Sequence, residues 1–491
     1  MKNLTSFIKA LPDTADANRH GIYGPSVSAY GETTVFVARL QERDVLVSTG
    51  PDAPRFKGEQ VEDDGIRYVV SPTDHANADV LRAMFPHTKP VRVLGRERTI
   101  GLGDRLGIAG EGHLRAVFGT DVHPVLAQQS IRELTMTGRT YEDVLDAATY
   151  AVFKAGHKTG FGADGDHLKK PEDIEYALSL GFSMITLDCS DYIRPDAPDP
   201  EKALDPELAS EYLDKTFSLD GADISFDMTS LKRASHIYDD AISYTAHVWN
   251  TYLKDTRPAD FELSIDETGT PTTPTEHFYV ANELSKRGVI LETLAPRFCG
   301  EFQKGIDYIG DIKAFESELD IHAAIARHFG YKLSIHSGSD KFSIFESIGR
   351  LTRGTFHVKT AGTNWLEAMR VVAEKDPDLF REVHTYALDM FEEATKSYHV
   401  TTDLDRIPSL DTLSDDDLPH LFSNDDARQL IHITYGFILN RKDDNGTFVF
   451  KDRLFALWNS EKETYATRLD THISKHLGLL LKGASDNKGD L

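Results

Sequence analysis

GFGADGDHLKKPEDIEYALSLGFSMITLDCSD, residues 160–191, contains one complete strand–helix–strand unit. The segment 160–168 has the character of a strand, Pro171 suits the first turn of a helix, and Gly181 suits its end. The segment 182–191 predicts a second strand. Two strands joined through a helix favour a parallel sheet, so this stretch predicts an α/β fold.

Further strands alternate with helical segments on both sides of this unit. Thr140 suits the N-cap of a helix that runs to Ala155, and Thr273 and Glu276 form the capping-box pattern of another helix. An eighth strand is expected between residues 298 and 315, near 308–312. The seven predicted strands are 99–107, 160–168, 182–191, 261–267, 289–295, 331–340 and 355–362.

This alternation is typical of a (β/α)8 barrel or of a doubly wound sheet, and two features favour the barrel. In FELSIDE (261–267), apolar Leu263 and Ile265 alternate with Ser264 and Asp266, and ionisable residues gather at the ends of several strands. We therefore predict an α/β, TIM-like barrel over 96–365 that carries an insertion at 192–258. An N-terminal α+β portion (1–95) and a C-terminal helical region (366–491) complete the expected organisation.

Composition narrows the classes of partner. The 491 residues include 79 acidic and 54 basic side chains, a formal charge of −25, which disfavours nucleic acid and anionic membranes as partners. We find no secretory signal and no apolar run long enough to span a membrane, so a cytoplasmic protein is expected. Cys189 and Cys299 are the only cysteines, too few for a disulfide framework. Assembly into a homo-oligomer stays open.

Carboxylates and imidazoles at the predicted strand ends suit a divalent cation. We predict His167, Glu267 and His336 as ligands, with Asp166 as a further ligand or as a hydrogen-bonding partner of one. Each of these residues taken alone is more often a helix cap, a loop hydrogen bond or a surface charge. Their recurrence at equivalent strand ends favours a metal site, whose ion would be Zn²⁺, Mn²⁺ or Ni²⁺.

Other polar residues are candidates for binding an anion. Ser337 and its neighbours offer hydroxyl and backbone donors, Lys341 adds charge, and Lys359 and Arg105 lie on strands that barrel closure makes neighbours. An ordinary turn with solvated bases explains the same residues equally well. Gln128, together with Arg132 and Thr135, would share one face of a helix and bind substrate hydroxyls, although a purely structural helix is the simpler interpretation. Arg428, His432 and Tyr435 also share a helix face and form either a lid or a packing surface.

Four segments resemble the tagaturonate epimerase family: 160–193, FELSIDETGTPTTPTEHF (261–278), KLSIHSGSDKFS (332–343) and FHVKTAGTNWLEA (356–368). The likeness runs from about residue 100 to the C-terminal helices. It implies a metal-dependent enzyme of hexuronate breakdown that interconverts D-tagaturonate and D-fructuronate, with a sugar acid as its small-molecule substrate.

The implied reaction inverts C4, which lies β to both the ketone and the carboxylate and therefore carries no acidified proton. We expect retro-aldol cleavage and re-addition, with Asp188 and Asp266 as general acid and base and with Lys359 or Lys341 holding the carboxylate. Transient oxidation would need a redox cofactor, for which we find no site. The alternatives are a metal-dependent sugar isomerase, an aldolase, and a sugar-acid binding protein without turnover.

Overall fold

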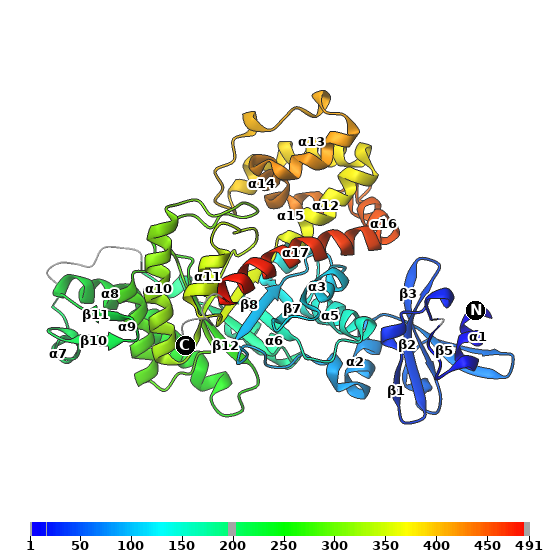
Figure 1. Ribbon diagram of the computed structural model, residues 1–491, viewed down its shortest axis with the longest axis horizontal. Coiled ribbons are helices and arrows are strands. Elements are labelled where there is room, and N and C mark those ends of the chain that lie inside the picture. Colours follow the sequence, from blue (N-terminus) through cyan, green and yellow to red (C-terminus); the bar gives the residue numbers. More distant parts are fainter. Residues whose placement is uncertain (1, 16, 195–202, 486–491) are drawn as a thin grey trace.

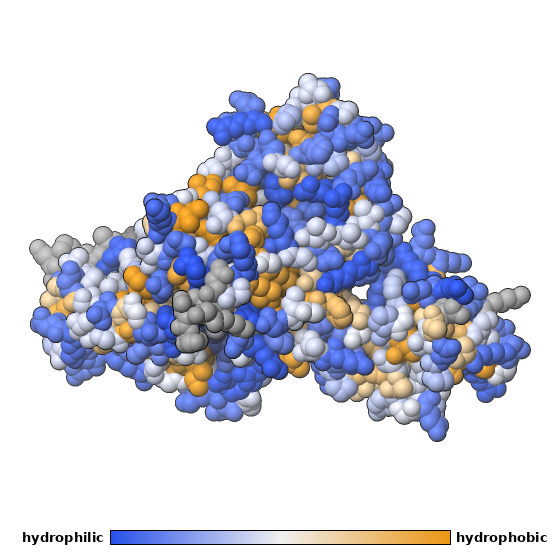
Figure 2. Space-filling model, viewed as in Figure 1, coloured by the Kyte–Doolittle hydropathy of each residue, from blue (hydrophilic) through white to orange (hydrophobic). Residues whose placement is uncertain are grey.

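Figure 1 shows the computed structural model, which describes residues 2–15, 17–194 and 203–485. A barrel occupies the middle of the chain, a small β-sheet lies beside it at the N-terminus, and a group of C-terminal helices lies over it. Figure 2 shows hydrophilic residues over much of the visible face, as the excess of acidic side chains leads one to expect.

Eight strands close into the barrel in the order β12-β13-β14-β15-β6-β7-β8-β9, and every neighbouring pair is parallel. This closure confirms the predicted fold class. The strands are β6 (Arg98–Leu102), β7 (His123–Ser130), β8 (Gly162–Leu168), β9 (Met184–Asp188), β12 (Asp260–Ile265), β13 (Thr293–Pro296), β14 (Lys332–Ile335) and β15 (Phe356–Thr360).

The predicted position of the eighth strand is wrong. The missing strand is β7, between β6 and β8, whereas the segment around 308–312 makes only an isolated bridge between Glu301 and Ile309. β7 ends in a run of polar residues, and its last residue, Ser130, is also the N-cap of the next helix. No loop separates this strand from the helix, so the polar strand end resembles the first turn of a helix. Gln128 therefore lies on β7 and not on the predicted helix face.

Helices pack around the barrel, and three of them begin at the capping residues or the proline that the sequence predicts. Thr140 and Asp143 form a capping box at the start of α5, Thr273 and Glu276 form one at the start of α9, and Pro171 is the first residue of α6. The helices between barrel strands include α3 (Gly110–Val117), α4 (Ile131–Thr137), α5 (Tyr141–Ala155), α6 (Pro171–Ser179), α8 (Met228–Val248), α9 (Pro274–Lys286), α10 (Ile312–Phe329) and α11 (Phe345–Leu351).

The N-terminal portion is an antiparallel sheet in the order β1-β2-β3-β5-β4, joined to the barrel through α2. Arg82 of α2 donates to Asp146 of α5 over 2.9 Å, which ties the two parts together. The elements are α1 (Lys2–Ala10), β1 (Ser28–Tyr30), β2 (Thr33–Leu40), β3 (Arg43–Thr49), β4 (Glu59–Asp63), β5 (Ile66–Pro72) and α2 (His75–Met84).

The insertion between β9 and β12 combines α8 with a short helix and a hairpin, α7 (Pro206–Tyr212), β10 (Thr216–Leu219) and β11 (Ala222–Ser225). Residues 195–202 of the predicted insertion lie outside the described residues. Among the helices that the structure describes, none combines the length and apolar character needed to cross a membrane.

The last helix runs from the C-terminal helices across the barrel (Figure 1). α17 lies against α11, and this crossing requires glycine on both helices. A Cβ at Gly349 or at Gly483 would lie 2.0 Å from a backbone carbonyl oxygen of the other helix. The C-terminal helices are α12 (Thr363–Lys375), α13 (Pro377–Thr395), α14 (Asp425–Ile433), α15 (Tyr435–Asn440), α16 (Lys451–Ser460) and α17 (Lys462–Ser485).

Candidate active site

A small cavity of about 70 Å³ lies where the carboxyl ends of the barrel strands meet. Barrel enzymes keep their chemistry at this end, because the strand-to-helix loops there are free to vary. A much larger cleft of about 1410 Å³ lies between the N-terminal sheet and the outer barrel helices, but none of the histidines predicted as ligands lines it. We therefore place the site at the smaller cavity. Its lining residues are Arg105, Gln128, Asp166, His167, Asp266, Glu267, Lys304, His336, Ser337, Ser339, Lys359, Ala361, Gly362 and His432.

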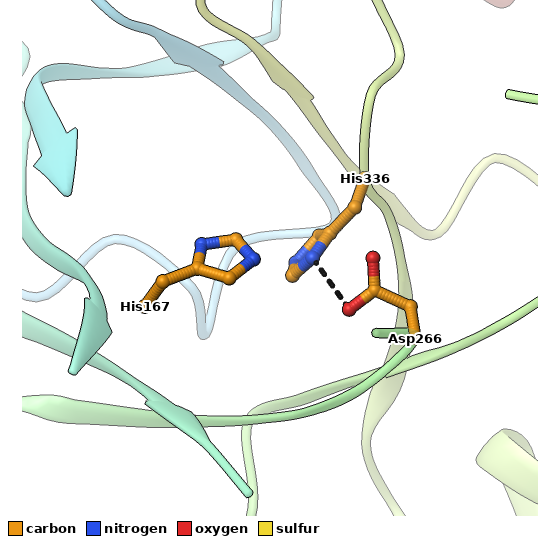
Figure 3. Close-up of side chains that lie close together, drawn as sticks. All are labelled: His167, Asp266 and His336. Carbon is orange, nitrogen blue, oxygen red and sulfur yellow. Dashed lines mark hydrogen bonds and ion pairs between the residues drawn. The ribbon is translucent and has the colours of Figure 1, made fainter. Parts of the chain in front are cut away.

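Three of these residues converge on one corner of the cavity (Figure 3). His167 comes from β8, Asp266 follows β12 and His336 follows β14. One ligand atom from each lies within 4.8 Å of the other two, and the centres of the imidazole rings are 5.0 Å apart. We call this group the barrel-mouth cluster.

A carboxylate lies behind each imidazole of the barrel-mouth cluster. Nδ1 of His167 lies 2.8 Å from Asp166, and Nε2 of His336 lies 2.8 Å from the buried Glu262. Such bonds fix the tautomer and orientation of a metal-binding histidine. They leave Nε2 of His167 and Nδ1 of His336 for the cavity, and the latter lies 3.2 Å from Asp266.

The ionisation of the cluster follows from these contacts. Burial disfavours a protonated His167, but the adjacent Asp166 outweighs it and raises the pKa of His167 to about 10. Burial likewise disfavours an ionised Asp266, but the facing His336 outweighs it and holds the pKa of Asp266 well below its usual range. Asp266 is therefore a carboxylate, the form that binds a cation.

The donor set and geometry of the barrel-mouth cluster fit a divalent cation. Two imidazoles and one carboxylate are typical ligands of Zn²⁺ and similar ions, and a site with three protein ligands keeps a position for substrate. The backbone of His167 is left-handed, with φ 53°, and Ser337 beside the cavity has φ 49°. Strained non-glycine residues of this kind concentrate at functional sites.

The structure brings Asp266, instead of the predicted Glu267, together with the two histidines. Asp266 joins the histidines, whereas Glu267 lines the cavity without belonging to the barrel-mouth cluster. Asp266 is held in place by Ser264, whose hydroxyl donates to it over 2.5 Å. Glu267 has no hydrogen bond or ion pair with any other described residue, so its carboxylate is available to a ligand.

Lys359 lines the cavity but is already neutralised. Its Nζ lies 2.6 Å from Asp166, 2.7 Å from Asp164 and 2.8 Å from Glu262, inside the barrel. It also donates to Thr186 over 2.6 Å. The lysine therefore balances the carboxylates behind the histidines, and it has little charge left for a substrate.

Two predicted site residues do not line the cavity. Asp188 is buried, and its carboxylate accepts the backbone N–H of Ser190 at 2.8 Å, as a local turn does. Lys341 is buried as well, and its ammonium donates to three backbone carbonyls, those of Gln303 (2.9 Å), Ile306 (2.6 Å) and Ser339 (3.0 Å). Lys341 thus holds a loop in place and has no direct access to a ligand.

The other predicted binding residues do reach the cavity. Arg105 is buried and pairs with Glu133 through Nε (2.9 Å) and Nη2 (2.8 Å), and it stacks 4.1 Å from the ring centre of Tyr435. Gln128 reaches the cavity from inside the barrel and donates to the carbonyl of Thr360 at 3.3 Å. Ser337 accepts a hydrogen bond from Lys304 over 3.0 Å.

Lys304 is a charged lining residue that no sequence pattern predicts. It lies in the irregular segment between β13 and α10, where no periodicity or motif marks it. His432, singled out as part of a lid or packing face, also lines the cavity from α14. His432 fits closely over Gly362, where an added Cβ would lie 1.9 Å from the imidazole ring.

A second group of one aspartate and two histidines lies nearby, formed by Asp340, His472 and His476. We call it the α17 cluster. His472 contacts Asp340 through Nε2 and Glu367 through Nδ1, at 3.0 Å for the latter. His476 accepts the backbone N–H of Asp340 on Nε2 at 3.0 Å and donates from Nδ1 to the carbonyl of His472 at 2.9 Å. His476 therefore spends both ring nitrogens on backbone groups, and none of the three residues lines either cavity described above.

Comparisons with known proteins show the family of this chain. The family model described as tagaturonate epimerase matches residues 23–480. The tagaturonate/fructuronate epimerase of Thermotoga maritima is 43% identical over 473 residues, which cover 94% of this chain and 96% of that protein.

Crystal structures of the fructuronate-tagaturonate epimerase of Cohnella laeviribosi are also similar. The native structure has 48% identity and a TM-score of 0.91, and a complex with one glycerol has a TM-score of 0.90. Each comparison covers 98% of this chain and 99% of the other. The chain therefore belongs to the tagaturonate epimerase family and is an isomerase of the epimerase type.

Proposed function

We propose that the protein interconverts D-tagaturonate and D-fructuronate by inverting C4, with a divalent cation held by His167, Asp266 and His336. The observation that carries the metal requirement is the barrel-mouth cluster, in which each imidazole keeps one nitrogen for the cavity. The substrate pair rests on the names of the similar enzymes. Zn²⁺, Mn²⁺ and Ni²⁺ all suit these ligands.

The position of C4 favours cleavage of the C3–C4 bond. The hydrogen on C4 is not acidic, whereas the C4 hydroxyl lies β to the ketone, as a retro-aldol reaction requires. Loss of the hydroxyl proton turns C4 into an aldehyde, and the electrons of the C3–C4 bond pass into the enediolate of the C1–C3 fragment. The cation, when bound, supplies Lewis-acid stabilisation of this negative charge.

Inversion then requires one fragment to turn while the other stays fixed. Rotation about C4–C5 presents the opposite face of the aldehyde to C3. Re-addition forms the C3–C4 bond again, and the proton returns to the oxygen on C4. The C3 centre keeps its configuration only when the enediolate stays in place, so both fragments must remain held throughout.

Glu267 is the side chain best placed to move the hydroxyl proton. It lines the cavity beside the barrel-mouth cluster, and no described residue pairs with its carboxylate. The earlier candidates suit this role less well, because Asp266 faces His336 and Asp188 does not line the cavity. In this proposal Asp266 is a ligand and Glu267 is the general base and acid.

The reaction in deuterated water tests this mechanism. Retro-aldol chemistry keeps the original hydrogen on C4, so D-tagaturonate formed from D-fructuronate is expected to carry no deuterium there, as NMR would show. Deuterium entering C4 at the rate of epimerisation would contradict the mechanism. The absence of any conversion by protein loaded with each of the three metals would contradict the proposed activity itself.

A further inference from the structure

One wall of the cavity is built from cationic and unsatisfied polar groups that the metal site does not use. Arg105 comes from the loop after β6, Lys304 from the segment before α10, and His432 from α14 of the C-terminal helices. These three residues lie far apart in the sequence. Their meeting at the cavity gives the C-terminal helices a part in the site.

Arg105 keeps one donor nitrogen unused. Its Nε and Nη2 bind Glu133, whereas its buried Nη1 has no hydrogen-bond partner among the described residues. A buried, charged donor without an acceptor is costly, so such groups usually mark the place of a ligand. The stacking on Tyr435 fixes the guanidinium plane in front of that place.

His432 is unsatisfied in the same way. In the part of the chain that the structure describes, neither of its ring nitrogens finds a partner, although the side chain is buried. Burial and the neighbouring Arg105 and Lys304 hold the pKa of His432 well below its usual range. The imidazole is therefore neutral, and it offers one donor and one acceptor to a hydroxyl.

Lys304 is held at the cavity by its backbone. The carbonyls of Gln303 and Ile306 bind Lys341, and the carbonyl of Gly305 accepts from Arg428 at 2.7 Å. Within the described residues, the Lys304 side chain itself makes one hydrogen bond, to the hydroxyl of Ser337. The loop is thus clamped on both sides of Lys304, while the ammonium stays available.

We propose that Lys304 and Arg105 bind the substrate carboxylate, with His432 at an adjacent hydroxyl, so that this wall selects sugar acids over neutral ketoses. The inference rests on the proposed function and deepens it. Retro-aldol cleavage leaves the carboxylate on the fragment whose aldehyde must turn. A carboxylate anchored away from the barrel-mouth cluster holds this fragment while its far end rotates about C4–C5.

The test compares a charged substrate with its neutral counterpart. Lys304→Met is the main variant, since removing Arg105 would also leave Glu133 buried without its partner. Lys304→Arg keeps the charge, and Lys313→Met removes an exposed lysine at the start of α10 as the matched control. The metal-loaded enzymes are assayed with D-fructuronate and with D-fructose, which has CH₂OH in place of the carboxylate.

Lys304→Met is expected to lower kcat/KM for D-fructuronate by roughly 10- to 100-fold, mostly through KM, the usual cost of one charge-assisted hydrogen bond. Its kcat/KM for D-fructose should stay within about twofold of the unmodified protein, and Lys304→Arg should recover most of the loss. An equal loss on both ketoses, or no loss on either, would overturn the inference. Equal melting temperatures for all variants would show that the fold is intact.

A binding measurement separates this inference from the proposed function. Calorimetric titration with D-glucuronate and with D-glucose needs no turnover. A preference for D-glucuronate that Lys304→Met abolishes would support the carboxylate site even if D-fructuronate is not converted. Conversion of D-fructuronate without any such effect of Lys304→Met would leave the proposed function standing and overturn the carboxylate site.

Discussion

The barrel-mouth cluster and the α17 cluster contain the same residue types, one aspartate and two histidines within reach of a common point. They differ in what the remaining atoms contact. At the barrel mouth, each imidazole spends one nitrogen on a carboxylate behind it and turns the other to the cavity. On α17, His476 uses both nitrogens on backbone groups, and His472 lies between two buried carboxylates away from the cavity.

On this difference we base the proposal of a metal at the barrel-mouth cluster and of none at the α17 cluster. A metal needs a lone pair that no donor already occupies, and it needs a route for solvent. The barrel-mouth cluster lines a cavity, which gives a cation such a route. The α17 cluster instead neutralises the buried Asp340 with His472 and Arg428, and so fastens α17 and α14 to the loop after β14.

The largest expected effect is at the barrel mouth. His336→Ala removes one of three proposed ligands and should reduce turnover of D-fructuronate by about 10³- to 10⁴-fold, which corresponds to several kcal/mol of lost transition-state stabilisation. The melting temperature of the variant should stay close to that of the unmodified protein, so that unfolding does not explain the loss of turnover. Steady-state kinetics after incubation with excess metal checks this prediction, and recovery of full turnover there would contradict it.

Asp340→Asn should disrupt the ion pairs of the α17 cluster. It leaves His472 and Arg428 buried without their carboxylate, so we expect a loss of about 3 kcal/mol in the free energy of unfolding. Bound metal should not change. Denaturant unfolding and elemental analysis measure the two quantities, with the exposed Asp389→Asn as the control. Loss of metal with unchanged stability would reverse the assignment of the clusters.

Glu262→Gln tests the support behind His336. The carboxylate accepts from His336 and from Lys359, each at 2.8 Å, and an amide there offers a weaker acceptor. Changes to such supporting carboxylates weaken metal binding by about 10- to 100-fold. A metal titration with a competing chelator gives the affinity. Unchanged affinity would mean that Glu262 does not orient the imidazole.

The last expected effect is a pH dependence in the α17 cluster. Burial disfavours a protonated His472, but Asp340 and Glu367 outweigh it and raise the pKa of His472 to about 9. A raised pKa stabilises the folded state fully below the unfolded value of about 6.5, and this contribution disappears as pH rises through about 9. The cost of His472→Gln should therefore be up to about 3 kcal/mol at pH 6 and should shrink by pH 9.5. Denaturant unfolding at both pH values measures it, and a constant cost would contradict the prediction.

Alternation and capping made most of the barrel predictable. FELSIDE also held information on the ligands that the prediction did not use. Side chains alternate along a strand, so Asp266 continues the inward set of Glu262 and Ser264, whereas Glu267, one residue further past the end of β12, does not. This parity favours Asp266 over Glu267 as the partner of the histidines, as the structure shows.

The positions of Lys304 and Lys341 could not be predicted from the sequence. Lys341 follows a strand and resembles a binding residue, yet its donors satisfy carbonyls of a loop more than thirty positions away. That loop has no regular structure, and its path depends on Lys341 and Arg428, so nothing local indicates that Lys304 reaches the cavity. Long-range contacts of single side chains decide both placements.

Metal content measured in parallel on three proteins tests the central claim most directly. The unmodified protein and His476→Ala should each hold one divalent ion per chain after metal loading and desalting, whereas His336→Ala should hold none. Stripping the unmodified protein should abolish turnover of D-fructuronate, and refilling should restore it. Metal that is lost in His476→Ala and kept in His336→Ala, or turnover that survives complete stripping, would contradict the account.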